Sequence, residues 1–452
     1  MFWRICILLS ALLLLFTPFI AAKRGYKLSK ICKNSEKTLI PYLVQENVYA
    51  APIYGNISET LYYYVNVYVG DPANPSKQAL IVDTGSTATC LPCKEKCTKC
   101  GNHIFPQFSL SESSKASVEH CNGHNCECGE SNECLFTSFY DEGSLYEGFY
   151  VTDYFQFSDN TLISKAPRYT FGCVTKETNL FLTQEANGIM GLAPVIRNEF
   201  KPVYYTYYET GFIKKLQFSL LLTKDGGVMY LGGYDSSVLL EPVQNIIWMK
   251  NIAEENYIVK FDSYSVGGQL LPGNLIKAKI DSGMTFVYTT KKQFNHIDQV
   301  INSLCRQGNY KCLGEKYSQG CYKFSPIQEL TYEDFFYSYP VISFNMGSQK
   351  VHWYPNDYFY RKNPTTFCLA IEPFASDETK VVLGASFLRN NLAIFDIENK
   401  RIGIVRAALN GCENTQSSVN SCNIHPDLSP IIASEEDIIK YNRVSSTKSR
   451  LE

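Results

Sequence analysis

The sequence predicts an all-β fold with minor helices, arranged as two related β lobes. Short segments rich in β-branched and aromatic residues recur between turns from residue 61 to about residue 405. The 32 Tyr and 27 Phe among 452 residues agree with this, because aromatic residues favour strands. A weak internal repeat is the third observation. Twice, an apolar strand ends in an acidic residue, a hydroxyl residue and a glycine, and an apolar–apolar–Gly segment follows about a hundred residues later.

The individual strands are bounded by turn residues. Residues 62–69 are β-branched and aromatic apart from Asn66, and they end at a Gly-Asp-Pro turn. Residues 79–82 are an apolar strand that ends at Asp83. Residues 228–233 and 381–384 are further examples. Helical periodicity is scarce, and 290–306 is the best candidate for a helix.

The chain length exceeds one typical domain, so we divide the sequence into successive segments. These are a signal peptide (1–22), a short pro-segment or N-terminal strand (23–60), an N-terminal lobe (61–242) with a Cys-rich insert (90–134) and a hairpin (137–153), a C-terminal lobe (243–411) and a polar tail (412–452).

The N-terminus indicates entry into the secretory pathway. Arg4 precedes an apolar run, Ile5 to Ala22, and Lys23-Arg24 follow it, which is typical of a signal peptide. The alternative is an uncleaved anchor, since the run is barely long enough to span a bilayer. We expect membrane contact only through this segment, if it is retained.

The cysteines support the same compartment. Of 17 cysteines, one (Cys6) lies in the signal, and the other 16 could all be paired as disulfides. Eight lie in the insert: Cys90, Cys93, Cys97, Cys100, Cys121, Cys126, Cys128 and Cys134. The spacing of the first four, with His103 nearby, also fits a zinc site, but secretory entry favours disulfides. We expect no metal and no cofactor. Asn56, in an Asn-Ile-Ser triplet, is a candidate glycosylation site.

Composition excludes some classes of protein. With 45% hydrophobic and 19% charged residues, the chain can bury a large core. The net charge of −2 indicates no nucleic-acid surface. We expect a monomer.

The two acid loops are the sharpest feature of the sequence. Residues 81–86 read Ile-Val-Asp-Thr-Gly-Ser and residues 279–283 read Lys-Ile-Asp-Ser-Gly. In each, the glycine permits a tight turn, and the hydroxyl of Thr84 or Ser282 can hydrogen-bond across to the other loop. One such triplet is ordinary turn chemistry. Two copies, each after a strand and each followed by the apolar–Gly element, predict a functional pair.

If the lobes are related by a pseudo-dyad, Asp83 and Asp281 meet at the seam. Like carboxylates in contact cannot both ionise, so they share one proton. The ionised partner can then accept a proton from a bound water, and the protonated partner can donate to a scissile carbonyl.

Here the chain resembles the pepsin-like aspartic proteases, from about Tyr62 to Val405. The resemblance implies a bilobal fold with the active-site cleft between the lobes, and an aspartic endopeptidase that acts on polypeptides. It implies that Asp83 and Asp281 are catalytic, in loops that also hold Thr84, Gly85, Ser86, Ser282, Gly283 and Thr285. It implies that segments 188–192 and 382–384 thread under these loops, and that 394–403 is the closing strand. Residues 140–144 resemble the flap, with Tyr140 as its tyrosine and Gly143 in its turn.

Simple pepsins lack the Cys-rich insert, whereas nepenthesin-type enzymes and the plasmepsin V subfamily of apicomplexan parasites carry one. The flap sequence Tyr-x-Glu-Gly-Ser resembles the flap sequence of the plasmepsin V subfamily. That resemblance implies that Glu142 and Gln184 hold an arginine three residues before the cut, with cleavage after leucine in an Arg-x-Leu export motif. It places the protein in the endoplasmic reticulum; secreted or vacuolar locations are the alternatives. A carboxylate at the flap tip does favour arginine, although Glu142 could instead be a solvated hairpin residue.

Four departures from the family pattern stand out. Met284 replaces the Ser or Thr that follows the second acid-loop glycine, and Thr285 comes one place late, which puts the pH optimum in doubt. Cys90 stands where pepsins have a tryptophan, and Asp141 where the subfamily has a cysteine. The fourth departure concerns the C-terminus: the plasmepsin V subfamily ends in a membrane anchor, and we expect none here.

Two further readings stay open. One is a broad-specificity, cathepsin D-like digestive or vacuolar protease. The other is an inactive pepsin-like binding protein, for which Met284 is the only support.

Overall fold

The computed structural model describes residues 42–45, 47–121, 126–140, 143–157, 166–195, 200–271, 276–374 and 381–409, and all of them belong to one compact unit. The expected signal peptide, the first part of segment 23–60, the polar tail, Asp141 and Glu142 lie outside the described residues. Within the described ranges, no helix combines the length and the apolar character that a bilayer crossing requires.

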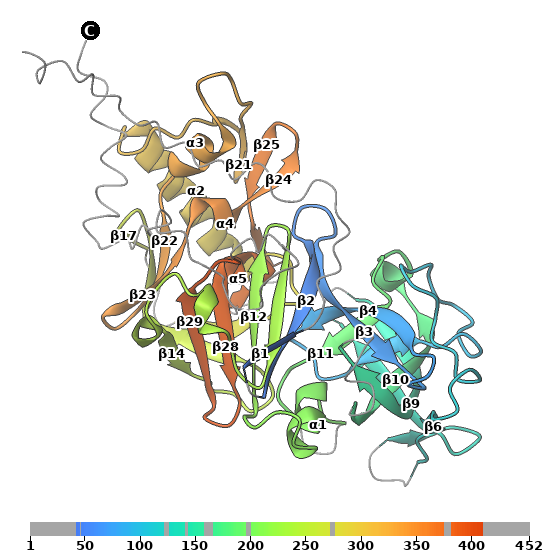
Figure 1. Ribbon diagram of the computed structural model, residues 1–452. Coiled ribbons are helices and arrows are strands. Elements are labelled where there is room, and N and C mark those ends of the chain that lie inside the picture. Colours follow the sequence, from blue (N-terminus) through green and yellow to red (C-terminus); the bar gives the residue numbers. More distant parts are fainter. Residues whose placement is uncertain are drawn as a thin grey trace, which may run out of the picture. The chain divides into compact units, whose positions relative to one another are not determined.

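The prediction of an all-β fold with minor helices is confirmed (Figure 1). The largest sheet contains β1 (Tyr42–Gln45), β2 (Val48–Asn56), β3 (Tyr62–Val69), β4 (Ser76–Asp83), β5 (Cys90–Pro92), β6 (Ser117–Val118), β7 (Glu127–Cys128), β8 (Cys134–Phe139), β9 (Leu145–Gln156), β10 (Arg168–Glu177), β11 (Gly188–Gly191), β12 (Gln217–Thr223), β13 (Gly226–Leu231), β14 (Ile247–Lys250), β28 (Asn391–Asp396) and β29 (Arg401–Arg406).

Three smaller sheets use the intervening chain. The first contains β15 (Ile258–Phe261), β18 (Ile276–Ile280), β27 (Val381–Leu383), β19 (Val287–Thr289) and β26 (Ile371–Pro373). The second contains β17 (Gln269–Leu270), β16 (Ser263–Val266), β22 (Ile342–Met346) and β23 (Gln349–Trp353), and the third β20 (Glu315–Ser318), β21 (Cys321–Lys323), β25 (Thr366–Leu369) and β24 (Phe359–Asn363).

The described residues contain few helices, and only α2 is long. They are α1 (Val203–Glu209), α2 (Lys291–Arg306), α3 (Tyr332–Tyr337), α4 (Pro355–Tyr358) and α5 (Ala385–Leu388), with 3₁₀ turns at η2 (Asn179–Leu182), η3 (Ser236–Val238) and η4 (Val243–Asn245). The predicted helix at 290–306 is confirmed as α2. Thr290 and Gln293 close its N-terminus with a capping box, and Ile297, Val300, Ile301 and Leu304 are buried.

The internal repeat corresponds to two copies of one strand arrangement. In the first half, β11 runs parallel to β4, with Met190 opposite Val82, and β5 and β10 continue the order β4-β11-β5-β10. In the second half, β27 runs parallel to β18, with Leu383 opposite Ile280, and the order is β18-β27-β19-β26. Each acid loop therefore follows the same strand of the same four-stranded unit, which confirms two related β lobes.

The glycines of the apolar–Gly segments allow a close approach of backbone to backbone. A Cβ at Gly191 would lie 2.4 Å from the carbonyl carbon of Thr87, and a Cβ at Gly384 would lie 2.1 Å from the carbonyl oxygen of Phe286. Any larger residue would push these segments away from the chain that follows each acid loop. The repeated glycine in the sequence therefore has a packing reason in both lobes.

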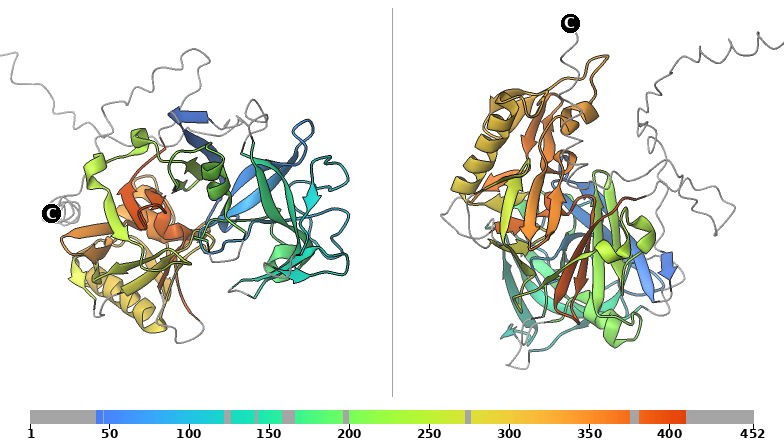
Figure 2. Two further views of the ribbon diagram at one scale, coloured as in Figure 1. Left: turned by 90° about the horizontal axis from the view of Figure 1, so that it is seen from below. Right: turned by 90° about the vertical axis from the view of Figure 1, so that its left-hand side faces the viewer.

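The C-terminal strands correct one expectation. Residues 394–403, expected to form one closing strand, belong to a hairpin of β28 and β29. β28 pairs with β12 from the first half of the chain, and β29 pairs with β14. Figure 2 shows these red strands against the green strands of β12 and β13. Strands from both halves thus share one sheet, and the proposed lobe boundary near residue 242 stays a prediction.

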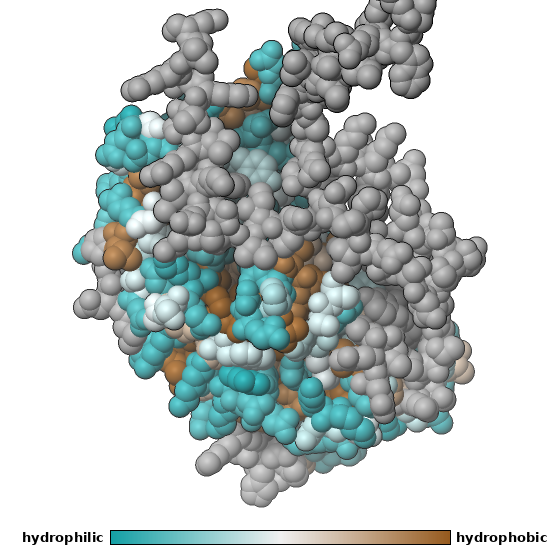
Figure 3. All heavy atoms as spheres, turned by 60° about the vertical axis from the view of Figure 1, so that its left-hand side comes forward, coloured by the Kyte–Doolittle hydropathy of each residue, from teal (hydrophilic) through white to brown (hydrophobic). Residues whose placement is uncertain are grey.

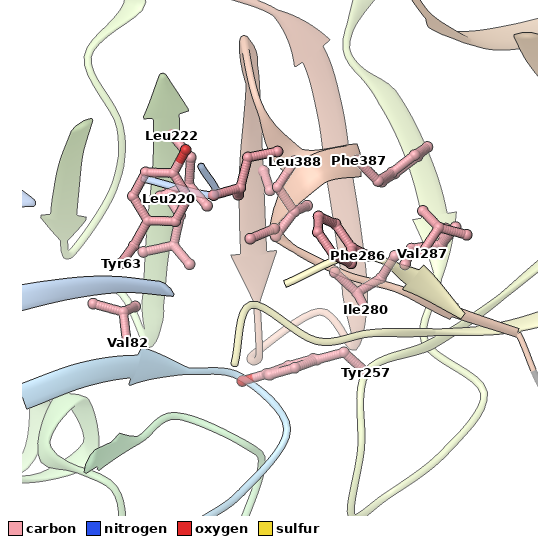
Figure 4. Close-up of a cluster of buried hydrophobic side chains, with 14 of the residues drawn as sticks. Tyr63, Val82, Leu220, Leu222, Tyr257, Ile280, Phe286, Val287, Phe387 and Leu388 are labelled. Atoms are coloured by element: carbon pink, nitrogen blue, oxygen red, sulfur yellow. The ribbon is translucent and has the colours of Figure 1, made fainter. Parts of the chain in front are cut away.

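A continuous core lies beneath the acid loops. Figure 4 shows Val82 and Leu220 from the first half near Ile280, Phe286 and Phe387 from the second. Val82 and Ile280, which directly precede the two acids, are fully buried. Burial of these side chains fixes the strand ends that carry the acids. On the face in Figure 3, hydrophilic side chains cover most of the described surface.

Candidate active site

Four hydrogen bonds join the two acid loops. The backbone N of Thr84 donates to Oγ of Ser282 (3.0 Å), and the backbone N of Ser282 donates to Oγ1 of Thr84 (2.9 Å). Each hydroxyl then donates to a strand carbonyl of the other loop's chain, Thr84 to Ile280 (3.1 Å) and Ser282 to Val82 (2.7 Å). The expected hydroxyl hydrogen bonds between the two loops are confirmed, and they form a symmetric, buried network that holds the loops together.

The glycine of each loop lies against the carboxylate of the other. A Cβ at Gly85 would be 2.1 Å from Oδ2 of Asp281, and a Cβ at Gly283 would be 2.4 Å from Oδ1 of Asp83. Real Cβ atoms do not approach oxygens so closely, so only glycine fits at either position. Asp83 and Asp281 therefore face one another across the two loops.

Asp83 is 6% exposed and is held by its own loop. Its Oδ1 accepts from the backbone N of Gly85 (2.8 Å), and its Oδ2 accepts from the Ser86 hydroxyl. Burial, and next the charge of Asp281, raise the pKa of Asp83 to about 7, although Ser86, Gly85 and the charge of Lys279 act to lower it. Asp83 therefore keeps its proton below about pH 7.

Asp281 is 5% exposed and has different partners. Its Oδ1 accepts from the backbone N of Gly283 (3.1 Å), and its Oδ2 forms an ion pair with Nζ of Lys279 (2.8 Å). Thr285, expected as part of this loop, donates its hydroxyl to the carbonyl of Leu61 instead of to Asp281. Sequence reasoning missed the Lys279 contact.

The flap is a hairpin of β8 and β9. Phe139 pairs with Leu145, the backbone N of Tyr140 donates to the carbonyl of Ser144 (3.0 Å), and Gly143 adopts φ +90°. That φ suits glycine, which explains this residue in the turn. Glu142, the expected specificity residue, lies outside the described residues.

The ring of Tyr140 packs edge-on against Phe181, with ring centroids 4.9 Å apart, and Phe181 stacks on Tyr146. The Tyr140 hydroxyl is buried near Ser86 without forming a well-oriented hydrogen bond. Burial raises the pKa of Tyr140. A neutral tyrosine thus extends from the flap toward the loop of Asp83.

Gln184 lies behind the flap, directly after η2. Its Nε2 donates to the hydroxyl of Tyr146 (3.1 Å) and to the carbonyl of Ala186 (3.2 Å). Both amide hydrogens have partners, so Oε1 is the atom that can accept a hydrogen bond from a ligand.

A buried pair fixes the backbone of Gln184. His103 Nδ1 lies 3.1 Å from the Gln184 carbonyl, and His103 Nε2 lies 3.2 Å from Oε2 of Glu177. Burial alone would lower the pKa of His103, but the hydrogen bond and charge of Glu177 and the Gln184 carbonyl raise it overall. His103 thus ties the Cys-rich insert to the segment that carries Gln184.

Seven of the eight insert cysteines form disulfides in the described chain. The pairs are Cys93–Cys173, Cys97–Cys100, Cys121–Cys128 and Cys126–Cys134, with Cys305–Cys312 and Cys321–Cys368 in the second half. Cys90 corrects the expectation that all 16 could pair, because it is a buried free thiol among the described residues. Burial raises the pKa of the Cys90 thiol, so it behaves as a small apolar side chain.

A cavity lies between Thr87 and Thr89, which follow the acid loop, and Phe136 and Tyr150 of the β8–β9 hairpin, and Phe200 also lines it. The other predicted site residue, Asn56, lies at the end of β2, where its Oδ1 accepts from two backbone N–H groups. Its glycosylation stays a prediction.

Comparisons with known proteins give one family. A family model described as eukaryotic aspartyl protease matches residues 62–407. An alignment 390 positions long with Aspartic protease 5 of Toxoplasma gondii is 27% identical and covers 80% of this chain and 38% of that protein. An alignment 443 positions long with plasmepsin V of Plasmodium falciparum (isolate 3D7) is 23% identical and covers 80% of this chain and 73% of that protein. The vacuolar aspartic protease of Candida albicans is 23% identical over 398 residues, 84% and 83% of the two chains.

Proposed function

Because the chain belongs to the eukaryotic aspartyl protease family, we propose that Asp83 and Asp281 are the catalytic pair of this endopeptidase. The observation that carries the proposal is the contact of each acid-loop glycine with the opposite carboxylate. That packing holds two carboxyl groups together in a buried place, which is the condition for sharing one proton.

The pair would act on a peptide bond with one water molecule. The ionised carboxylate accepts a proton from the water, whose oxygen attacks the carbonyl carbon, while the protonated carboxyl group donates to the carbonyl oxygen. The tetrahedral intermediate collapses as the carboxyl group that took the proton of the water passes it to the leaving amine. The other carboxylate recovers a proton from a hydroxyl of the intermediate, which leaves a new carboxyl end and restores the pair. Tyr140 would cover the substrate when the flap closes and exclude bulk water.

The rate of peptide hydrolysis should fall above neutral pH. The raised pKa of Asp83 means that its proton is lost as the pH rises through about 7. Without that proton the pair is doubly ionised and cannot donate to the carbonyl oxygen. We expect kcat/KM to fall about tenfold per pH unit on this alkaline limb, measured with a peptide that carries no titrating side chain. A rate that keeps rising to pH 9 would contradict a shared proton.

We further propose that the enzyme prefers arginine three residues before the cut, in Arg-x-Leu-type sequences. The flap sequence places Glu142 beside Gly143, and Gln184 presents Oε1 as an acceptor behind the flap. A carboxylate and an amide oxygen together suit the several donors of a guanidinium. The similarity to plasmepsin V supports this assignment. The corresponding location is the endoplasmic reticulum, within the secretory pathway.

A cleavage panel tests the preference. Peptides that differ only in Arg, Lys or Ala three residues before the cut should give kcat/KM about 10- to 100-fold higher for Arg than for Ala, since hydrogen bonds to charged groups contribute about 1.5–3 kcal/mol. Glu142→Gln should reduce the Arg/Ala ratio about tenfold with little change for the Ala peptide.

Glu147→Gln is the matched control. Glu147 belongs to the same hairpin but pairs with Lys176 (2.7 Å), so its loss should leave the ratio unchanged. Equal rates for all three peptides in the unaltered protein would remove the arginine preference and favour the broad-specificity alternative. Absence of any cleavage would favour the inactive binding protein.

A further inference from the structure

The candidate site contains a lysine. Nζ of Lys279 lies 2.8 Å from Oδ2 of Asp281 and 3.2 Å from the carbonyl oxygen of Gly85, which belongs to the other acid loop. The Lys279 side chain is 24% exposed and that of Asp281 is 8% exposed. This ammonium therefore bridges the two loops at the place where their carboxylates meet.

The strand explains why the lysine points there. Alternate residues of a strand share a face, so Lys279 and Asp281, two apart at the end of β18, lie on the same side. Lys279 is opposite Ile258 on β15 and Val382 on β27. These apolar neighbours flank its aliphatic stem, and the charged end reaches the carboxylate.

We propose that Lys279 is a positioning residue that keeps Asp281 as the ionised member of the pair and Asp83 as the protonated member. The inference rests on the proposed roles of these two acids, and it does not depend on the arginine preference. An ammonium in contact with a carboxylate favours the ionised form of that carboxylate. If the two carboxyl groups had identical surroundings, the shared proton would have no preference for Asp83 over Asp281.

Among the described residues, the two carboxylates differ in one side-chain partner. Each accepts from the backbone N of its own loop glycine, but Asp83 also accepts from the neutral Ser86 hydroxyl, whereas the corresponding place after Gly283 is Met284. Lys279 supplies the second donor that Met284 cannot, and it adds a full charge. The raised pKa of Asp83 agrees with a proton on that side.

Other ionisable groups lie farther along the same surfaces. Tyr140 extends from the flap toward Asp83 and is neutral. On the sheet of β18, Tyr288 pairs with Val382 on the far side from Lys279, and Glu372 pairs with Tyr288 one strand farther on. Strands are about 4.8 Å apart, so these groups are about two and three strand spacings from Lys279. Among the described residues, Asp281 is the carboxylate that forms an ion pair with the ammonium.

Removing this charge should move the pH dependence of catalysis. A positive charge beside the pair eases the loss of both of its protons, so its removal raises both limbs of the bell-shaped profile. We expect Lys279→Met and Lys279→Gln to shift the acid and alkaline limbs of kcat/KM upward by about 1 pH unit or more. Lys279→Arg should keep both limbs within about 0.3 unit, because it keeps the charge.

The experiment uses the full chain and a blocked peptide whose only charged side chain is arginine. Lys277→Met is the matched control, because Lys277 is exposed on the same strand and its loss should leave both limbs in place. Thermal melting checks that each variant is folded, and Lys279→Gln carries the same expectation if Lys279→Met fails to fold.

If the acid and alkaline limbs of kcat/KM stay in place in both Lys279→Met and Lys279→Gln, the inference is overturned, whatever the size of the rate. An equal shift in Lys279→Arg would also overturn it, because the charge would not be the cause. Loss of the bell itself, or cleavage that survives Asp83→Asn, would count against the proposed catalytic pair instead, so the two failures are distinguishable.

Discussion

We expect Asp83→Asn and Asp281→Asn each to lower kcat for peptide hydrolysis by about 10³-fold, because neither variant can share a proton between two carboxyl groups. Both acids are almost fully buried, and an amide has nearly the size of a carboxyl group. Its Nδ2 only donates, so each variant also loses one of the contacts that its carboxylate accepts. The measurement is single-turnover cleavage of a peptide that the unaltered protein cuts, with thermal melting as the check on folding.

The matched control for this pair of variants is Asp225→Asn. Asp225 lies in the exposed turn between β12 and β13, where it pairs weakly with Lys224 (3.7 Å). Its replacement should leave kcat unchanged. A rate within tenfold of the unaltered protein in either Asp83→Asn or Asp281→Asn would show that the water is activated by another group.

Thr84→Val should have the largest effect on stability. The valine keeps the shape of threonine but removes the hydroxyl that accepts from the backbone N of Ser282 and donates to the carbonyl of Ile280. Thr84 is fully buried, so the groups left behind cannot turn to water. Each buried group left unpaired costs about 1–3 kcal/mol, and we expect the free energy of unfolding to fall by about 2–4 kcal/mol.

Chemical denaturation of the two forms measures this loss, and peptide cleavage should fall with it because the loops lose their alignment. Thr84→Ser keeps the hydroxyl and loses one methyl group, so it should cost only about 1 kcal/mol. Equal destabilisation by Ser and Val would mean that the methyl group, and not the hydrogen bonds across the seam, holds the loops together.

The sequence predicted the features that depend on a few adjacent residues. The predicted bounds of β3 and α2 agree with the observed bounds because their residue patterns are local. The acid loops were recognisable because an Asp–hydroxyl–Gly triplet follows a strand twice. The hydroxyl bonds across the seam followed from the assumption of two related lobes. No residue outside these short segments was needed for those predictions.

Features that depend on distant contacts were missed. Lys279 was part of the quoted motif, and strand alternation alone would have placed it on the side of Asp281, but whether its ammonium reaches Oδ2 depends on the flanking strands. Thr285 bonds to Leu61, which is 224 residues away. The partner of Cys93 is Cys173, outside the insert, while Cys90 stays unpaired. Spacing alone does not encode such pairings.

A crystal structure of the protein with pepstatin would test the shared-proton site most directly. A single hydroxyl of the inhibitor replaces the attacking water, so we expect it within about 3 Å of an oxygen of Asp83 and of an oxygen of Asp281. Lys279 should remain bound to Oδ2 of Asp281 in that complex. An inhibitor hydroxyl in contact with only one of the two carboxylates, or bound away from both, would contradict the account.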